Sequence, residues 1–324
     1  MAIPPEYGKP KCYREGVSTD YQHGRLRQHM NSSQSTINDY VSSLKLPISL
    51  LNVFVGIAAI LLAVGLHASF DVMFLTGLSG FLAAGGASAV NCYIDRELDR
   101  RMSRTRNRPI PGGRIPASNI LVLGLLLSVI GVGLAAVYLN VLTALLIGMG
   151  VFWYIFVYTL WLKPRTKWNI VIGGAAGSFS ALAGWSAATG TINIVGVLVA
   201  ALIFLWTPGH FWGLAIAKSK DYENGEVPML PVVEGQTRAS LYTALSNALL
   251  FPFTIALYFL TVNWTNVLVA TLVGLAITAL NLRFILANIQ LSRLHDAMSA
   301  WRVFKLSASY LFIILCLIVL GHVA

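Results

Sequence analysis

Asn91, Asp95 and Asp99 stand four residues apart in the segment AVNCYIDRELDRRM, at the end of an apolar stretch. An α-helix turns about 100° and rises about 1.5 Å per residue, so the three side chains form a stripe about 12 Å long that drifts by about 80°. Two carboxylates this close repel each other unless a cation lies between them. Because Asp and Asn oxygens suit a hard ion that also binds water and phosphate, the spacing predicts a magnesium site.

Arginines surround this acidic stripe. Residues 92–117 hold seven arginines, three acids and the turn sequence RPIPGGRIP. Arg104, Arg106 and Arg108 follow the acids in a segment that can fold back over them, and arginine forks bind phosphate oxygens bidentately. The arrangement predicts a diphosphate clamp, with Arg104 and Arg108 as candidate substrate-binding residues. The alternative is an ordinary loop whose acids balance its arginines.

A second polar cluster also follows an apolar stretch, in TPGHFWGLAIAKSKDYENGEVPMLPVVEG. Its similar placement predicts a second half-site for metal and diphosphate, which faces the first across a cavity; a solvated loop is the alternative. Pro228 and Pro231 predict an extended or turning segment, which would act as a lid. The charged members of the cluster are Lys218, Lys220, Asp221, Glu223 and Glu226.

Candidate residues also lie in and beside other apolar stretches. His210 follows a Pro-Gly pair inside one of them, and polar residues at membrane depth usually face a cavity. A packed core histidine is the alternative. Lys163 and Arg165, in YTLWLKPRTKWN, are candidates to reach a leaving diphosphate. Cations that snorkel at a helix end are the alternative for this pair.

Composition indicates which elements must position these residues. The chain has 324 residues, of which 56% are hydrophobic and only 11% charged, and its mean hydropathy is +0.70. These values exclude an ordinary soluble domain, in which roughly 25% of residues are charged. Nine stretches are each near the ~20 residues needed to cross a bilayer as a helix. They are residues 46–66, 71–91, 118–138, 141–161, 170–189, 193–213, 240–261, 264–283 and 306–322.

The placement of the basic residues predicts the topology. All 23 Lys and Arg fall on one side of the nine spans, whereas the loops near His67, Asn140, Thr191 and Asn263 carry none. The positive-inside rule then places the N-terminus in the cytoplasm and the C-terminus on the opposite side of the cell membrane. The net charge of +10 follows from this bias and does not indicate nucleic acid binding.

The domain prediction follows from the same pattern. Residues 1–40 are polar and are expected to form a flexible cytoplasmic tail. Residues 41–324 are expected to form an all-α membrane domain, a bundle of nine transmembrane helices. Residues 92–117 and 214–239 are its expected cytoplasmic cap loops.

The polar motifs together resemble the UbiA superfamily of intramembrane prenyltransferases. The resemblance rests on NCYIDRELD, RTRNRPIPGGRI, KPRTKWNIVIGGAAGS, TPGHFW and KDYENGEVPMLPVVEG, and it extends over roughly residues 38–320. The combination of TP-x-HFW, KDY and PMLPVV is most similar to the branch that farnesylates protoheme IX, the heme O synthases. The resemblance implies nine helices around a central cavity.

The resemblance also implies roles for individual residues. Magnesium would bridge the acidic motifs to the prenyl diphosphate, and in the KDY triplet Lys220 would be catalytic and Tyr222 would contact substrate. Gly225 stands where related enzymes commonly have a second Asp, so either Glu223 or Glu226 substitutes or one metal ligand is absent. The family's frequent TPPHFW is TPGHFW here. The implied metal ligands are Asn91, Asp95, Asp99 and Asp221.

The implied reaction joins farnesyl diphosphate to a vinyl group of heme b, with addition of water. A dry cavity is required, and Trp206 or Phe211 would stabilise the farnesyl cation by cation–π contact. His210 would either ligate the heme iron or orient the water. The implied partners are both substrates, the lipid bilayer and a downstream heme-modifying enzyme or terminal oxidase assembly.

Other functions stay open at this stage. A UbiA-type enzyme acting on an aromatic quinone precursor or a lipid would use the same diphosphate chemistry. A transporter also fits nine spans with intramembrane His, Pro and Gly, although its charges would lie nearer the midplane. An assembly factor without a cofactor would need no metal.

Overall fold

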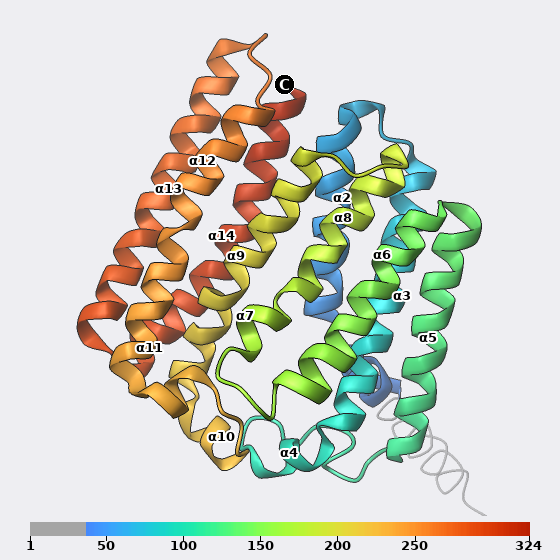
Figure 1. The fold of residues 1–324 in the computed structure, drawn as a ribbon, viewed down its shortest axis with the longest axis vertical. Coiled ribbons are helices and arrows are strands. Elements are labelled where there is room, and N and C mark those ends of the chain that lie inside the picture. The colour runs from blue at the N-terminus through green and yellow to red at the C-terminus, as the bar shows by residue number, and fades with distance from the viewer. Residues whose placement is uncertain (1–36) are drawn as a thin grey trace, which may run out of the picture. The chain divides into compact units, whose positions relative to one another are not determined.

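A computed structural model describes residues 37–324, and the tail predicted for residues 1–40 lies almost wholly outside that range. Within it, nine helices are long and apolar enough to cross a membrane, which confirms the predicted number (Figure 1). Residues from Asp39 onward form one compact unit. The spans are α2 (Leu46–Val64) with the 3-10 turn η1 (Gly65–His67), α3 (Phe70–Ile94), α5 (Ala117–Tyr138), α6 (Val141–Phe152) with η2 (Trp153–Leu162), α7 (Asn169–Gly173) with α8 (Ala175–Thr189), α9 (Ile194–Ala217), α11 (Leu230–Ala248) with α12 (Leu250–Thr261), α13 (Val267–Leu294) and α14 (Ala297–Val323).

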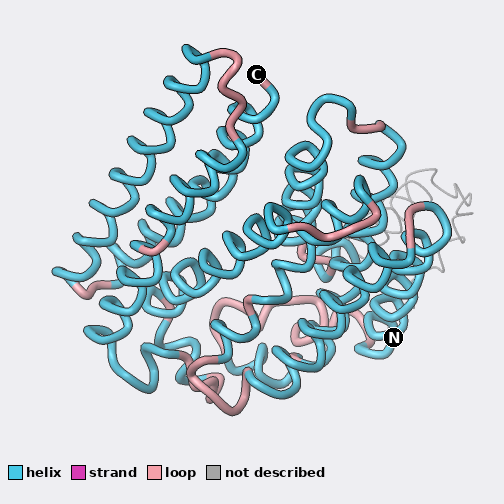
Figure 2. The backbone as a smooth tube through the Cα atoms, turned by 45° about the horizontal axis from the view of Figure 1, so that its top comes forward, coloured by secondary structure: helices cyan, strands magenta, loops and turns pink. Residues whose placement is uncertain are grey.

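Two helices begin well before their predicted spans. The seventh span starts at Leu230 and the ninth at Ala297, about ten residues earlier than hydropathy indicated. The added parts include charged residues, Glu234 and Arg238 in α11 and Arg302 and Lys305 in α14, and such residues extend a helix without adding to the apolar signal. Gly235, with φ of 78°, kinks α11 within this polar part. Figure 2 shows that the remaining connections are short loops between helices.

Short helices occupy the two segments predicted as cap loops. α4 (Arg96–Arg101) follows α3, and α10 (Ser219–Asn224) follows α9. Both lie at the same end of the bundle, away from the C-terminus (Figure 1). The two polar clusters of the sequence therefore meet at one end of the helices, which we call the mouth end.

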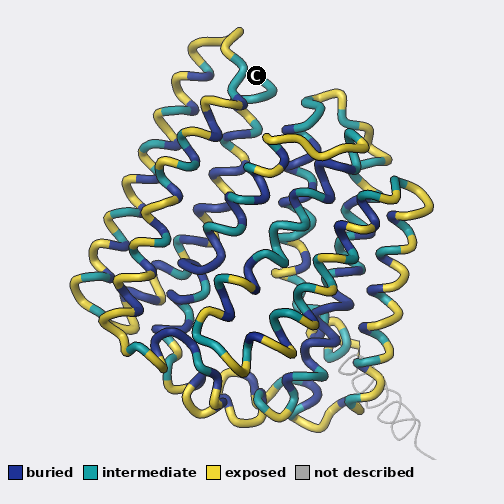
Figure 3. Tube along the Cα trace, in the orientation of Figure 1, coloured by how far each residue is buried: buried dark blue, intermediate teal, exposed yellow. Residues whose placement is uncertain are grey.

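The central helices are buried more than the outer ones (Figure 3). Half of the apolar window of α9 is buried, compared with 28% for α5 and for α13. The outward faces of α5 and α13 carry exposed apolar side chains such as Val129 and Leu275, as expected for helices that face lipid. The functional positions are therefore expected on the helices that surround α9.

Glycines allow α3 and α5 to approach closely. A Cβ atom built on Gly86 would lie 2.5 Å from the carbonyl oxygen of Gly124, and one on Gly124 would lie 2.8 Å from that of Gly86. In a membrane, where apolar burial does not drive helix association, such small-residue contacts provide much of the packing. They hold α3, and with it the acidic stripe, in a fixed position.

Candidate active site

The predicted acidic stripe keeps its helical register. The backbone N–H of Asp95 donates to Asn91 O at 2.9 Å, and that of Asp99 donates to Asp95 O at 2.7 Å. Asp95 separates α3 from α4 but preserves this four-residue bonding. All three side chains are buried, with 2% to 7% of their surface exposed.

Lysines from two other elements bind the first two members of the stripe. Lys45 Nζ donates to Asn91 Oδ1 at 2.5 Å, and Lys163 Nζ donates to Asp95 Oδ2 at 2.5 Å. The Asn91 amide donates in turn to Asp95 Oδ2 at 2.9 Å and to Thr159 Oγ1 at 3.1 Å. The ends of α2, α3 and η2 therefore meet in one polar network.

The third member, Asp99, pairs with an arginine of the following loop. Arg108 Nη1 lies 2.8 Å from Asp99 Oδ2, and the Thr105 hydroxyl donates to the Asp99 backbone oxygen at 3.1 Å. The loop therefore folds back over the acids, as its sequence predicted.

Asp221 joins the second cluster to the first. Its Oδ1 accepts hydrogen bonds from the Ser103 hydroxyl at 2.6 Å and from the Ser103 backbone N–H at 3.1 Å. Burial acts to raise the pKa of Asp221, but the hydrogen bonds from Ser103 and Arg104 outweigh it and hold the pKa below its ordinary value. Arg101 and Glu226 add an exposed ion pair at 2.8 Å between the same two segments.

Tyr222 and Arg104 lie beside this junction. Burial raises the pKa of the Tyr222 phenol, while the nearby guanidinium groups of Arg104 and Arg108 act in the opposite direction. Both arginines therefore approach the buried ring from the first cap segment. We refer to the assembled group as the mouth cluster, which consists of Asn91, Asp95, Asp99, Asp221, Lys45, Lys163, Arg104, Arg108 and Ser103.

A π-helix brings Lys163 to the mouth cluster. An α-helix turns about 100° per residue, so over nine residues Lys163 would face roughly 180° away from Tyr154. Residues 153–162 instead adopt i→i+5 bonding, seen in the bond from Lys163 N to Tyr158 O at 2.9 Å, which widens each turn. Tyr154 lines the cavity described next, and Lys163 contacts Asp95 from the same element.

A cavity of about 220 Å³ extends toward the mouth cluster, and its wall includes Ser88, which lies about one turn before Asn91 on α3. It runs between α2, α3, η2, α8 and α9, and most of its wall is apolar. Tyr154 and Tyr158 line it near the mouth end, with their rings stacked at 5.8 Å. Trp206 and Phe211, the two aromatic residues singled out in the sequence, also line it. An apolar chain can therefore extend from the charged mouth into the bundle.

His210 faces this cavity. Its ring is 9% exposed, stacks on Trp206 at 4.3 Å and lies 4.6 Å from Phe304. Its Nδ1 is 2.5 Å from the Ser307 hydroxyl, which leaves the other ring nitrogen for a cavity ligand. Pro208 lies within the helix, and a Cβ atom on Gly209 would lie only 1.9 Å from Asn247 Oδ1. Asn247 therefore packs directly against the backbone of Gly209.

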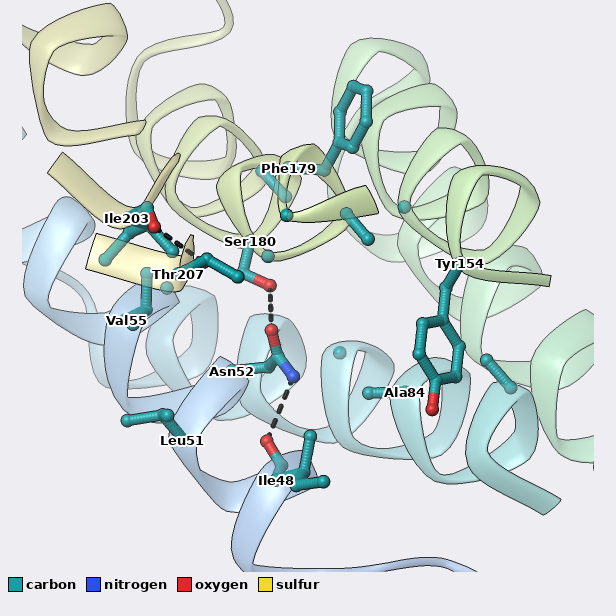
Figure 4. A pocket seen from close by; sticks show the side chains of 18 of the residues that line it. Ile48, Leu51, Asn52, Val55, Ala84, Tyr154, Phe179, Ser180, Ile203 and Thr207 are labelled. Atoms are coloured by element: carbon teal, nitrogen blue, oxygen red, sulfur yellow. Dashed lines mark hydrogen bonds between the residues drawn. The ribbon is translucent and has the colours of Figure 1, made fainter. Parts of the chain in front are cut away.

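Polar groups also line the cavity wall farther from the mouth (Figure 4). Ser180 Oγ donates to Asn52 Oδ1 at 2.7 Å, and Asn52 Nδ2 donates to the Ile48 carbonyl at 2.9 Å. In Figure 4 this pair lies between Thr207 and Tyr154. The cavity therefore offers fixed polar contacts to a ligand that is larger than an alkyl chain.

Two predicted site residues lie apart from the mouth cluster. Arg165 is exposed, and its Nη1 donates to the carbonyl oxygens of Leu160 and Trp161 at 2.9 Å each, so it caps η2. Lys220 is exposed and makes no ion pair within the part of the chain that the structure describes.

Residue-level reasoning on the sequence missed Lys45, Ser103, Thr159 and Tyr158. Lys45 stands just before the first span, where basic residues are expected for topology alone. The only local signal is backbone geometry, because Lys45 has φ of 50°, a left-handed conformation that is uncommon outside glycine and occurs at functional sites. Sequence alone does not reveal that conformation.

The donor set of the mouth fits a hard divalent cation. Asn91, Asp95, Asp99 and Asp221 offer only oxygen or amide groups and are all buried. Among residues 37–324, however, no three His, Cys, Asp or Glu side chains converge as a metal site. Each carboxylate is held by a lysine, an arginine or a serine instead.

Comparison with curated relatives identifies closely similar chains. The protoheme IX farnesyltransferase 1 of Cenarchaeum symbiosum is 43% identical over 242 residues, which cover 75% of this chain and 79% of that protein. The protoheme IX farnesyltransferase of Desulforudis audaxviator is 41% identical over 281 residues, or 86% of each chain. The chain spans about half (52%) of the Roseiflexus castenholzii protoheme IX farnesyltransferase, to which it is 38% identical.

Solved structures share the fold at low sequence identity. Digeranylgeranylglyceryl phosphate synthase aligns with a TM-score of 0.69 at 16% identity and covers 89% of this chain and 99% of that one. A UbiA homologue from Archaeoglobus fulgidus, bound to DMAPP and Mg²⁺, aligns with a TM-score of 0.65 at 16% identity, over 86% and 99% of the two chains. Residues 51–320 also match the family model described as the UbiA prenyltransferase family. This match and the relatives above 40% identity show that the chain belongs to the UbiA prenyltransferase family.

Proposed function

We propose that this chain transfers a farnesyl group from farnesyl diphosphate to a vinyl group of heme b, with addition of water, to give heme O. One observation carries the proposal: a buried mouth of acids and cations adjoins an apolar cavity that contains His210. The names of the relatives, which align over most of this chain, support the same acceptor and donor.

The cations of the mouth cluster bind the diphosphate. Lys45, Lys163, Arg104 and Arg108 come from three separate segments, so together they surround one anionic group. Magnesium, held by Asn91, Asp95, Asp99 and Asp221, supplies further neutralisation of the leaving diphosphate when bound. Electrostatic stabilisation of the leaving group is the main catalytic contribution of these residues.

The cavity protects the farnesyl cation from water. Its wall is mostly apolar, so bulk water does not reach the cation and form farnesol. The faces of Tyr154 and Tyr158 lie next to the mouth, where positive charge develops at farnesyl C1, and stabilise it by cation–π contact. Trp206 and Phe211 extend this aromatic lining toward His210.

The reaction requires no deprotonated protein nucleophile. The vinyl π electrons form a carbon–carbon bond to farnesyl C1 while the bond from C1 to the diphosphate oxygen breaks. The cation left on the vinyl carbon is captured by water, which then loses a proton. The products are a hydroxyethylfarnesyl heme, diphosphate and one proton.

His210 positions the heme substrate. One ring nitrogen is engaged by Ser307, which fixes the imidazole plane, and the other is available to the heme iron or to the captured water. Both roles place the porphyrin beside Trp206 and the polar pair of Asn52 and Ser180.

The proposal extends to the topology. The mouth end carries the basic loops, so it faces the cytoplasm, and the chain resides in the cell membrane with residues 1–40 as a cytoplasmic tail and 41–324 as the catalytic domain. The product would pass to a heme-modifying enzyme or to terminal oxidase assembly.

Mass spectrometry of extracted hemes tests this function. Membranes that contain the protein, supplied with heme b, farnesyl diphosphate and Mg²⁺, should yield a heme heavier by one farnesyl group plus water. Chelation of the metal should stop the reaction, and added Mg²⁺ should restore it. A farnesylated quinone precursor or lipid without modified heme would identify another acceptor and overturn the proposal. Absence of any diphosphate release would exclude a prenyltransferase reaction altogether.

A further inference from the structure

The cavity-facing side of α3 carries only small side chains. The residues of α3 that line the cavity are Thr76, Gly80, Ala83, Ala84, Ala87 and Ser88. Asn91 of the mouth cluster lies on the same helix, 11 residues beyond Gly80 and therefore about 16 Å along the axis. An apolar chain that starts at the mouth would follow this face toward Gly80.

Gly80 has no packing role among the described residues. A Cβ atom built there meets no atom within 4 Å. Other glycines of the cavity wall do meet neighbours: a Cβ atom on Gly173 would lie 2.4 Å from Tyr158, and one on Gly177 would lie 3.2 Å from Ile203. Glycine weakens a helix relative to alanine, and packing against a neighbouring helix does not account for the glycine at position 80. The open space beside Gly80 is the cavity itself.

Thr76 lies one turn beyond Gly80, and its side chain is larger than the glycine and alanines that line the cavity between it and Ser88. Its side chain is 5% exposed, and its hydroxyl has no hydrogen-bond partner among the described residues. This hydroxyl is already buried, so its cost does not depend on the donor; Thr76 acts by its bulk, because it lines the cavity and occupies volume that the glycine and alanines of the same face leave free. Gly80 therefore keeps the space open, and Thr76 opposes further extension.

We propose that Gly80 and Thr76 together set the longest prenyl chain that the donor site accepts. The inference rests on the proposed function, because it places the prenyl chain of the donor in this cavity. A side chain larger than hydrogen at position 80 would shorten the accepted chain. A smaller side chain at position 76 would admit a longer one.

The test measures donor binding without any acceptor. Purified wild type and variants are titrated calorimetrically, in detergent with Mg²⁺, with geranyl, farnesyl and geranylgeranyl thiolodiphosphate, which resist hydrolysis. Gly80→Leu should lower farnesyl affinity relative to geranyl affinity by about tenfold or more, because filling the space overpacks the site. Gly80→Ala should produce a smaller shift in the same direction and retain helix stability.

Two further variants complete the test. Thr76→Ala shortens the side chain and should raise geranylgeranyl affinity relative to farnesyl affinity by roughly threefold to tenfold. Gly133→Leu is the matched control, because Gly133 also has open space around its Cβ position but does not line the cavity. It should leave all three affinities unchanged.

The outcomes separate this inference from the proposed function. Unchanged length preference in folded Gly80→Ala and Thr76→Ala, in a protein that still farnesylates heme, would overturn the inference alone. The predicted shifts in a protein that modifies a different acceptor would support the inference and overturn the proposed heme reaction. Equal losses for all three donors in Gly80→Leu and Gly133→Leu would indicate a general folding defect and contradict a specific role of Gly80.

Discussion

Two buried polar clusters of this protein differ in what surrounds them. The mouth cluster contains carboxylates and cations from four segments and adjoins the cavity. The second, which we call the amide cluster, consists of Thr254, Asn281 and Tyr310 on α12, α13 and α14. Tyr310 donates to Asn281 Oδ1 at 2.8 Å, and Asn281 Nδ2 donates to Thr254 Oγ1 at 3.0 Å and to the Ile277 carbonyl at 2.9 Å. None of its members lines the cavity.

The comparison shows that polarity inside a membrane bundle does not by itself indicate function. The amide cluster is uncharged and satisfies its own hydrogen bonds, so it joins three helices without needing a ligand. The mouth cluster brings carboxylates together against an excess of cations, and such a site gains stability from a bound anion and a bound metal. Charge and access to the cavity separate the two.

Replacing a carboxylate of the mouth cluster should have the largest effect on activity. Asp95→Ala is expected to lower the kcat/KM of prenyl transfer by at least about 100-fold, because the variant loses a carboxylate that would hold the magnesium neutralising the leaving diphosphate. Product formation is measured by mass spectrometry. Asp71→Ala, an exposed acid in the first turn of the same helix, is the control and should keep normal turnover. Near-normal turnover of Asp95→Ala would show that the reaction does not depend on a metal held by Asp95.

His210 is intermediate between the two clusters, because it lines the cavity but is not one of the acids or cations of the mouth cluster. His210→Ala is expected to change the visible spectrum of bound heme and to lower turnover by at least about tenfold, or ~1.4 kcal/mol of transition-state stabilisation. His322→Ala is the control, because His322 bonds to the Thr261 carbonyl at the other end of the bundle. An unchanged spectrum together with full activity would show that His210, like the amide cluster, has only a structural role.

Lys45 tests whether the cations of the mouth bind the donor. Lys45→Met keeps most of the side-chain length but removes the charge, so we expect the donor KM to rise roughly tenfold with a smaller change in kcat. Lys45→Arg should recover part of the affinity. Lys305→Met, an exposed lysine of α14, should leave the KM unaltered. An unchanged donor KM for Lys45→Met would limit Lys45 to a structural bond with Asn91.

The amide cluster should affect stability and hardly affect activity. Asn281→Ala removes the acceptor of the Tyr310 hydroxyl, while Thr254 keeps its bond to the Phe251 carbonyl, and is expected to lower the free energy of unfolding by about 1–2 kcal/mol. Its turnover in the folded state should stay within about twofold of wild type. Denaturant unfolding in detergent measures the first quantity, with exposed Leu282→Ala as the control. A large loss of turnover at unchanged stability would show that the two clusters are coupled.

Local sequence patterns predicted much of the mouth cluster. The spacing of Asn91, Asp95 and Asp99 needs only helix geometry, and the bonds at Asp95 and Asp99 confirm it. The return of Arg108 over Asp99 also follows from a short loop that contains turn residues. The pairing of Ser103 with Asp221 was not predictable, because it joins residues 118 positions apart through one hydroxyl.

The π-helical segment marks another limit of sequence reasoning. Lys163 and Arg165 looked equivalent in the sequence, since both follow the fourth span. The wider turns of residues 153–162 direct Lys163 to Asp95, whereas Arg165 caps the end of the same element. Sequence periodicity assumes the α-helical turn and therefore gives no basis for choosing between them.

The sequence by itself determined the number of spans, the end of the bundle at which the charges gather and the kind of ion that the acidic stripe suits. These properties depend on hydropathy, charge bias and local helix spacing, which neighbouring residues define. Only the tertiary structure decided that Lys45 joins the stripe, that Asp221 reaches it through Ser103 and that Gly80 borders open space. Those contacts depend on how helices distant in sequence pack, which is set by side-chain shape across the whole bundle.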